Sequence, residues 1–232
     1  MQIARADTRL VRKALRWRCL KTARYTSARQ SNRPFAGFIM TLHDKTILFF
    51  AGPLYEDLEL WYPKIRLEEE GARTVVAGTG EKTYQGKRGY PLTVDTDVER
   101  IQASDFDGLV IPGGYAPDIM RRSQKLLQLT RDIYQAGKPV AFICHAGWVP
   151  ISAGIVRGKR GTSVGAIKDD LVNAGMLWED SPVVVDGNMI SSRTPADLPQ
   201  FCRAIIAALN ESSIVSRQST GAGNRKASVS NR

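Results

Sequence analysis

Short apolar runs that alternate with amphipathic stretches are the feature of this sequence that most restricts its fold. Three runs are continuous and strand-like, at 46–51 (TILFFA), 108–111 (GLVI) and 139–143 (PVAFI). Runs of this kind are typical of parallel strands that are buried on both faces. Further strands are expected at 73–77, 183–186 and 189–191, with a hairpin at 86–95. Helices are expected at 56–70, 123–136, 167–174 and from Thr194-Pro195 to Leu209, with a helical stretch after Cys144 that ends at Ala153. The alternation predicts a mainly parallel sheet with helices on both faces.

The charge of the chain is concentrated at its two ends. The 232 residues carry a formal net charge of +10. Residues 1–40 hold ten Lys and Arg residues and one acid, and residues 211–232 hold four and one. The segment 41–210 is left with 19 basic and 21 acidic residues, which is a near-neutral domain. The basic excess therefore does not indicate a nucleic-acid-binding or membrane-binding surface on the domain, and we expect neither kind of partner.

These differences divide the chain into a basic leader at 1–40, one domain at 41–210 and a disordered basic tail at 211–232. The leader has the Arg-rich, acid-poor composition of an organelle targeting peptide or a nucleic-acid-binding arm. Met40 stands directly before the first predicted strand, so translation from Met40 is an equal alternative. We expect a cytoplasmic protein, or an organelle protein if the leader is a transit peptide.

The chain has three cysteines, Cys19, Cys144 and Cys202, and two histidines, without a Cys-x-x-Cys pair. This supports neither a disulfide framework nor a zinc site, and it fits a reducing compartment. No apolar run approaches the length of a membrane-spanning helix. We expect no metal and no cofactor.

The ends of the three apolar runs are the places to look for a site, because ligands of parallel sheets bind beyond the carboxyl ends of the strands. The run at 139–143 leads directly into Cys144 and His145, followed by small residues and a helix. This order is typical of a nucleophile elbow in which a sharp turn exposes the side chain. A helix N-terminus after the turn would favour the thiolate, so we expect a lowered pKa for Cys144.

The other two strand ends provide companions for this cysteine. Gly113 and Gly114 follow the run at 108–111 and let the backbone approach a ligand, so that the N–H groups of Gly114 and His145 would form an oxyanion hole. Glu56 begins the helix after the first strand, where its carboxyl would reach the Cys144 sulfur. Asp57 and Glu59 are interpreted only as acids that suit a first helical turn.

The core from about residue 46 to 209 resembles the ThiJ/PfpI family, an intracellular-protease-like branch of the superfamily that includes DJ-1. The stretches that carry the resemblance are YEDLELWYPKIRLEEEG, GKRGYPLTVD, DGLVIPGGYAPD, GKPVAFICH, ISAGIVRGKRGTS, IKDDLVNAG, VVVDGNMISSR and PADL. The resemblance implies a flavodoxin-like three-layer sandwich, with Cys144 as nucleophile, Glu56 as its carboxyl partner and His145 as the adjacent catalytic histidine. It also implies a homo-oligomer, dimer or hexamer, in which an acid at the position of Asp118 orients the histidine of a neighbouring subunit.

The sequence departs from the family pattern around the same residues. Asp118 stands where members often have Glu, Tyr115 where they have Arg, and Val164 where they have Tyr. Ala146 and Gly147 follow the histidine instead of Gly-Pro. A carboxyl on Asp lies about 1.5 Å nearer the backbone than one on Glu, a shift that matters for hydrogen-bond reach.

Three functions remain after the histidines are considered. Glutamine amidotransferases of a related fold and papain-type proteases need a histidine downstream of the cysteine, and none follows His145. The favoured function is a cofactor-independent carbonyl-stress enzyme, glyoxalase-like or deglycase-like, that acts on methylglyoxal or early glycation adducts. The alternatives are an intracellular cysteine peptidase and a non-catalytic oxidative-stress sensor or chaperone in which Cys144 is oxidised and held by Glu56.

Overall fold

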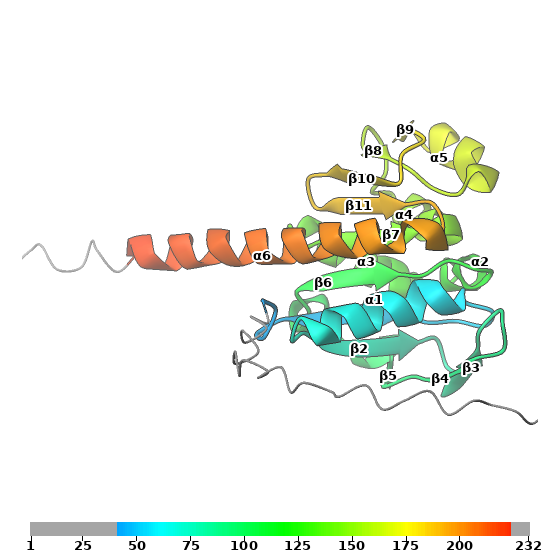
Figure 1. The fold of residues 1–232 in the computed structure, drawn as a ribbon, viewed down its shortest axis with the longest axis horizontal. Helices are drawn as coiled ribbons and strands as arrows, with labels where there is room; N and C mark the ends of the chain where they lie inside the picture. The colour runs from blue at the N-terminus through cyan, green and yellow to red at the C-terminus, as the bar shows by residue number, and fades with distance from the viewer. Residues whose placement is uncertain (1–40, 224–232) are drawn as a thin grey trace, which may run out of the picture. The chain divides into compact units, whose positions relative to one another are not determined.

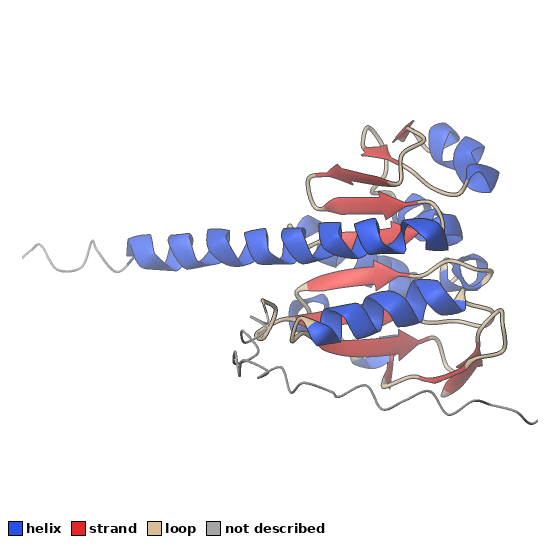
Figure 2. Ribbon diagram, viewed as in Figure 1, coloured by secondary structure: helices blue, strands red, loops and turns tan. Residues whose placement is uncertain are grey.

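A mainly parallel seven-stranded sheet forms the centre of the protein (Figures 1 and 2). The computed structural model describes residues 41–223, with side chains to residue 211. The strands follow the order β10-β11-β7-β6-β1-β2-β5. They are β1 (Thr46–Phe50), β2 (Arg73–Gly78), β5 (Thr96–Asp97), β6 (Gly108–Ile111), β7 (Val140–Ile143), β10 (Val183–Asp186) and β11 (Met189–Ser192). All pairs are parallel except β10 with β11.

The helices cover both faces of this sheet. Helices α1 (Asp57–Glu69) and α6 (Leu198–Gly223) pack together on one face, and α3 (Gln124–Gln135) and α4 (Trp148–Ala153) pack together on the other (Figure 1). Two shorter helices, α2 (Ala116–Met120) and α5 (Lys168–Asn173), follow β6 and β8 in the chain. The result is the three-layer α/β sandwich that the resemblance implies.

The centre of the core is made by the three predicted apolar runs. Every residue of β6 and β7 is buried, as are the last four residues of β1. Register places Leu48 opposite Leu109 and Val110 opposite Ala141, so the carboxyl ends of β1, β6 and β7 lie side by side. Helix α1, which follows β1, lies on one face of the sheet, and α3, which follows β6, lies on the other. The chain therefore changes faces between these two strands, and ligands of such sheets bind at this switch point.

Several smaller elements were not predicted correctly. The hairpin expected at 86–95 is present but begins earlier: β3 (Thr83–Gln85) and β4 (Pro91–Thr93) form an antiparallel pair around a turn at 86–90. Strands β5, β8 (Arg160–Gly161) and β9 (Leu177–Trp178) and helix α2 were missed, because elements of two to five residues carry too little periodicity. By contrast, Ser123 caps α3 as expected, and its side chain accepts the Leu126 N–H.

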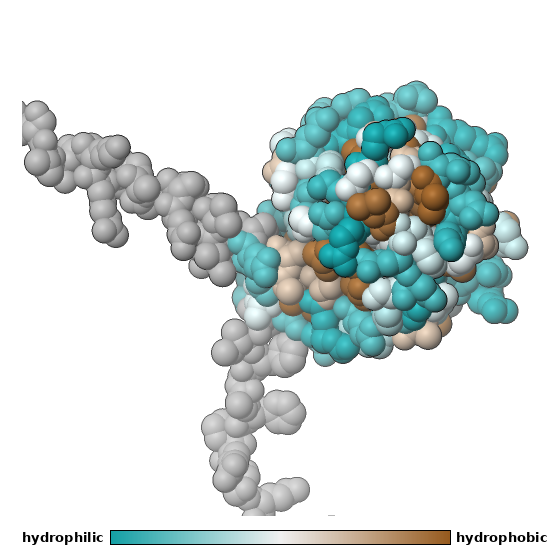
Figure 3. All heavy atoms as spheres, turned by 90° about the horizontal axis from the view of Figure 1, so that it is seen from above, coloured by the Kyte–Doolittle hydropathy of each residue, from teal (hydrophilic) through white to brown (hydrophobic). Residues whose placement is uncertain are grey.

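The expected end of the last helix at Leu209 is wrong, because α6 continues to Gly223. The tail predicted at 211–232 therefore begins inside this helix, and its remainder at 224–232 lies outside the described residues. The predicted leader at 1–40 also lies outside them. No helix of the described residues is long and apolar enough to span a membrane. The face around α5, β8 and β9 is mostly hydrophilic, with small separate hydrophobic patches (Figure 3).

Candidate active site

Cys144 occupies a strained turn at the end of a buried strand. Its φ of 61° lies in the left-handed region, at the junction of β7 and a 3₁₀ turn over Cys144–Gly147. A non-glycine residue in this region costs on the order of 1–3 kcal/mol and persists only where the surroundings impose it. The side chain is partly accessible, whereas Cys202 is buried. The predicted elbow is therefore present, and it presents the sulfur at the switch point.

Two backbone N–H groups point at this sulfur, those of His145 and Gly114. Gly114 has a φ of 80°, and a Cβ there would lie 2.5 Å from both the Glu56 nitrogen and the Leu54 oxygen. Only glycine fits where the loop after β6 passes so close to the start of α1. The two amides lie together beside the sulfur, and an oxyanion hole formed by them stays a prediction.

The carboxyl beside Cys144 belongs to Glu59, not to Glu56. Glu59 is fully buried, its Oε2 accepts the Gly113 N–H at 2.9 Å, and its carboxyl lies next to the Cys144 thiol, close enough to change the pKa of that group. Its Oε1 is buried and has no hydrogen-bond partner among the described residues. The expected pairing of Glu56 with Cys144 is therefore corrected.

The reason for this correction lies in the geometry of α1. Glu59 shares the inward face of the helix with Pro63 and Leu67, which follow at intervals of four residues and are also buried. Glu56 is the N-cap residue and precedes that face; its Oε2 instead lies 3.4 Å from Lys87 Nζ. The sequence carried a signal for this placement that was not recognised, because Glu59 is an acid on the apolar face of the predicted helix.

Burial sets the protonation of the pair formed by Cys144 and Glu59. Burial raises the pKa of Glu59 to about 8, and the neighbouring Glu56 charge adds to the effect. Burial and the negative charge of Glu59 raise the pKa of Cys144 to about 12. The expected lowering of the Cys144 pKa is therefore wrong. The helix that follows, α4, has only six residues and starts after an intervening 3₁₀ turn. Its dipole therefore stabilises the thiolate by less than burial destabilises it.

This protonation leaves Glu59 as a hydrogen-bond donor near neutral pH. A protonated carboxyl places no charge against a thiolate and can donate to it. The base that removes the thiol proton must then be another group. Glu59 is therefore suited to stabilise the thiolate once it has formed.

His145 is the neighbouring group that can accept this proton. Its Nδ1 lies 3.3 Å from the Cys144 sulfur. Burial, followed by the positive charge of Lys87, lowers the pKa of His145 below its ordinary value. The ring is therefore neutral at physiological pH, as a base must be.

Asp118, the expected partner of the histidine, lies elsewhere in this chain. It sits on α2, half exposed, and its carboxylate pairs with Arg122 one turn further on. No contact between Asp118 and His145 is present among the described residues. A role toward the histidine of another subunit stays a prediction.

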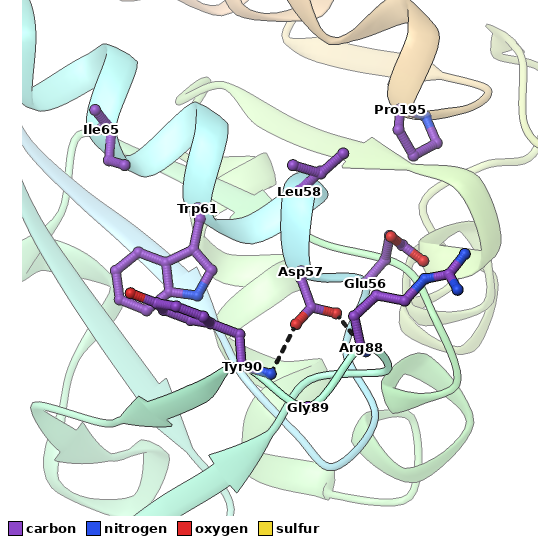
Figure 4. Close-up of a pocket in the computed structure, with 9 residues that line it drawn as sticks. All are labelled: Glu56, Asp57, Leu58, Trp61, Ile65, Arg88, Gly89, Tyr90 and Pro195. Atoms are coloured by element: carbon purple, nitrogen blue, oxygen red, sulfur yellow. Dashed lines mark hydrogen bonds between the residues drawn. The ribbon is translucent and has the colours of Figure 1, made fainter. Parts of the chain in front are cut away.

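Asp57 and Lys87 are two residues near the site whose roles sequence reasoning missed. The Asp57 carboxylate accepts the N–H groups of Arg88, at 2.8 Å, and Tyr90, at 3.1 Å (Figure 4). These bonds fix the turn at 86–90 and with it Lys87, whose Nζ also lies 5.7 Å from the centre of the Tyr115 ring. The stretch GKRGY at 86–90 is part of the family resemblance, but its sequence does not indicate that Lys87 lies near His145. The fold brings the two residues together.

A pocket of about 730 Å³ opens beside the site, between the outer side of α1 and the turn at 86–90 (Figure 4). Its lining residues are Glu56, Asp57, Leu58, Trp61, Ile65, Arg88, Gly89, Tyr90 and Pro195. Cys144 and His145 are not among them, so this hollow is separate from the reacting sulfur. Within the described side chains, no group of three His, Cys, Asp or Glu residues is placed to hold a metal ion.

Comparison with known proteins agrees with the fold. The DJ-1/PfpI family model matches residues 45–208. A Pyrococcus horikoshii protein named a deglycase is 45% identical over 163 residues, which cover 70% of this chain and 98% of the relative. An Escherichia coli protein named protein/nucleic acid deglycase 2 is 37% identical and is covered over 92% of its length, against 67% of this chain. The crystal structure of Drosophila melanogaster DJ-1beta matches with a TM-score of 0.68 at 31% identity, covering 76% of this chain and 96% of that one.

Proposed function

Because this chain belongs to the DJ-1/PfpI family, we propose that it is a cysteine-dependent carbonyl-stress enzyme that acts on methylglyoxal or on early glycation adducts. The observation that carries the proposal is the convergence on one sulfur of a neutral imidazole, a buried carboxyl and two backbone N–H groups. The relatives named deglycases, at 45% and 37% identity, support this class of substrate.

The first step uses His145 and Cys144. Nδ1 of His145 takes the thiol proton, and the sulfur attacks the aldehyde carbon of methylglyoxal, which forms a C–S bond and an alkoxide. The N–H groups of Gly114 and His145 stabilise this oxygen, and a proton from the imidazolium converts it to a hemithioacetal.

The remaining steps need only proton transfer and water. A proton moves from the hemithioacetal carbon to the adjacent carbon, that of the ketone, through an enediol intermediate. This isomerisation leaves a lactoyl thioester on Cys144. Water then cleaves the C–S bond, which releases lactate and returns the thiol. The sum is methylglyoxal plus water giving lactate. For a glycation adduct, the Cys144 sulfur forms its bond to the former aldehyde carbon as the bond from that carbon to the amine or thiol breaks. The leaving group takes the proton from the imidazolium, and the same hemithioacetal results.

The experiment is a turnover assay with a matched pair of cysteine variants. Methylglyoxal consumption, lactate formation and release of amine from a methylglyoxal-treated peptide are followed for the wild type, Cys144→Ser and Cys202→Ala. Turnover that is present in the wild type and Cys202→Ala and absent in Cys144→Ser supports the proposal. Turnover that survives in Cys144→Ser contradicts it.

The same protein preparations test the two alternatives. Cleavage of casein that depends on Cys144, without methylglyoxal turnover, would favour the peptidase. Stoichiometric oxidation of Cys144 at low peroxide, without turnover of either substrate, would favour the sensor, and the buried Glu59 carboxyl is then the group beside the sulfinate.

We also propose that the chain forms a homo-oligomer. Leu58, Tyr62 and Ile65 follow one another along α1 and are 57%, 39% and 58% exposed, and Tyr90 beside them is 60% exposed. A stripe of large apolar side chains on one helix face is typical of a protein contact. Asp118, which pairs only with the exposed Arg122 here, is proposed to approach the histidine of a neighbouring subunit.

The proposed location is the cytoplasm. Chemistry at a free Cys144 thiol needs a reducing compartment, and Cys202 is also a free thiol. The proposed substrates are small carbonyls or glycated peptides.

A further inference from the structure

His145 is held in this chain by an aromatic contact and not by an acid. Its Nδ1 faces the Cys144 sulfur, and no carboxylate among the described residues accepts a hydrogen bond from its ring. The ring instead meets Trp148, with centroids 5.4 Å apart and an interplanar angle of 61°, which is an edge-to-face arrangement. An imidazole that is free to turn about its side-chain bonds would present a carbon as often as Nδ1 to the sulfur, so this contact bears on the chemistry.

Trp148 is itself fixed from three sides. Its indole N–H donates to Asp170 Oδ2 at 2.7 Å. The Arg121 guanidinium lies 5.8 Å from the centre of its ring, and Arg121 Nε donates to Ser152 Oγ at 2.9 Å. The indole also packs against the hydrophobic core. Groups from α4, α5 and the end of α2 therefore determine where the indole lies.

We propose that Trp148 is a positioning residue for His145, which holds the imidazole with Nδ1 toward the Cys144 sulfur. Asp170 acts indirectly, because its carboxylate fixes the indole of Trp148, which in turn contacts His145. The inference rests on the proposed function only in taking Cys144 as the reacting group. It adds, within one chain, a contact that orients the ring beside the acid from a neighbouring subunit that the resemblance implies.

The test measures Cys144 itself and needs no substrate. The rate of alkylation of Cys144 by iodoacetamide is followed at pH 7 by peptide mass spectrometry, which separates it from Cys19 and Cys202. Because Nδ1 accepts the thiol proton, Trp148→Leu is expected to slow alkylation by roughly three- to tenfold, and Trp148→Phe, which keeps an aromatic edge, by less than about twofold.

The decisive comparison repeats Trp148→Leu in a His145→Ala background. A residue that acts through the histidine has no effect once the histidine is gone, whereas a residue that merely supports packing keeps its effect. An equal slowing in both backgrounds, or no slowing in the wild-type background, overturns the inference.

A surface pair of variants covers the case in which Trp148→Leu fails to fold. Asp169 and Asp170 are adjacent and exposed in the first turn of α5, and only Asp170 bonds the indole. Asp170→Ala is expected to slow alkylation about two- to threefold and Asp169→Ala not at all, with the difference lost in His145→Ala. Equal rates for the two variants overturn the role of Asp170. A wild type with no deglycase or glyoxalase turnover, in which these rate differences persist, would defeat the proposed function and leave this inference standing.

Discussion

The carboxyl of Glu59 is buried next to the thiol of Cys144, and this burial raises the pKa of both groups. The carboxyl is also tied to the backbone of the neighbouring strand end through the Gly113 N–H. The site therefore depends on α1, on the ends of β6 and β7, and on Gly113, which has no room for a side chain.

Replacing Glu59 should lower activity, and replacing Glu56 should not. Glu59→Gln keeps an acceptor for the Gly113 N–H, but its amide N–H is a weaker donor to the thiolate than a protonated carboxyl, and we expect kcat/KM to fall by roughly tenfold or more. Glu56→Gln breaks only the pair with Lys87 and should change kcat/KM by less than about threefold. A larger loss in Glu56→Gln than in Glu59→Gln would reverse the assignment.

The raised pKa of Glu59 predicts how stability depends on pH. The folded protein holds this proton up to about pH 8, whereas the unfolded chain releases it near 4.5, so the group lowers stability as pH rises between these values. Glu59→Gln removes the penalty. The stability of this variant relative to the wild type should grow by roughly 1.4 kcal/mol per pH unit across that window. Chemical denaturation between pH 5 and 8.5 measures this; a pH-independent difference would contradict it.

The pKa of His145 predicts the acid limb of the rate profile. His145 must be neutral to accept the thiol proton, so kcat/KM should fall only below its ordinary value of 6.5. Lys87→Gln removes the nearby positive charge and should shift this limb to higher pH. Lys82→Gln, in the same hairpin region, is the matched control and should leave the limb in place. A limb unmoved by Lys87→Gln shows that the lysine does not act on the histidine.

Gly113 should tolerate no side chain. A Cβ there would lie 2.6 Å from Glu59 Oε2 and 2.8 Å from Cys144 Cβ. Gly113→Ala is expected to cost on the order of 1–3 kcal/mol of stability and to displace the two groups, with loss of activity. Gly165→Ala is the control, because no atom lies within 4 Å of its Cβ position. Thermal unfolding and turnover of the two variants test this; full activity in Gly113→Ala would show that the contact is not needed.

An acid placed in the apolar stripe of α1 should dissociate the proposed oligomer. Ile65→Glu puts a charge on this stripe, and sedimentation velocity should then show a monomer. Val172→Glu makes the same change at another exposed aliphatic residue, on α5, and should leave the assembly unchanged. An Ile65→Glu protein that sediments like the wild type would move the contact to another surface.

Long apolar runs and glycine turns were predictable, because each has a signal that is complete within a few residues. The runs at β1, β6 and β7 read directly as buried strands, and the order of strand, Cys144 and small residues predicted the elbow that a φ of 61° confirms. The family resemblance, confirmed by the match over 45–208, added the flavodoxin-like three-layer arrangement. The last helix was placed correctly at its start but not at its end.

The choice between Glu56 and Glu59 was not predictable from local pattern, since both are acids at the start of one helix. Their separation by three residues places them about 60° apart around the helix axis. Which one faces the sulfur depends on how α1 is rotated over β1 and β6, and that rotation is set by the packing of Leu60, Pro63 and Leu67.

The sequence by itself determined a three-layer α/β protein with a cysteine in a sharp turn after its third apolar run, because hydrophobic periodicity and turn residues act over short distances. The tertiary structure decided which groups surround that cysteine. Burial, which raises the pKa of Cys144 and Glu59, and the approach of Lys87 to His145 arise from segments as far apart as residues 59, 87 and 145. Electrostatic and packing effects depend on distance in space, and only the folded chain fixes those distances.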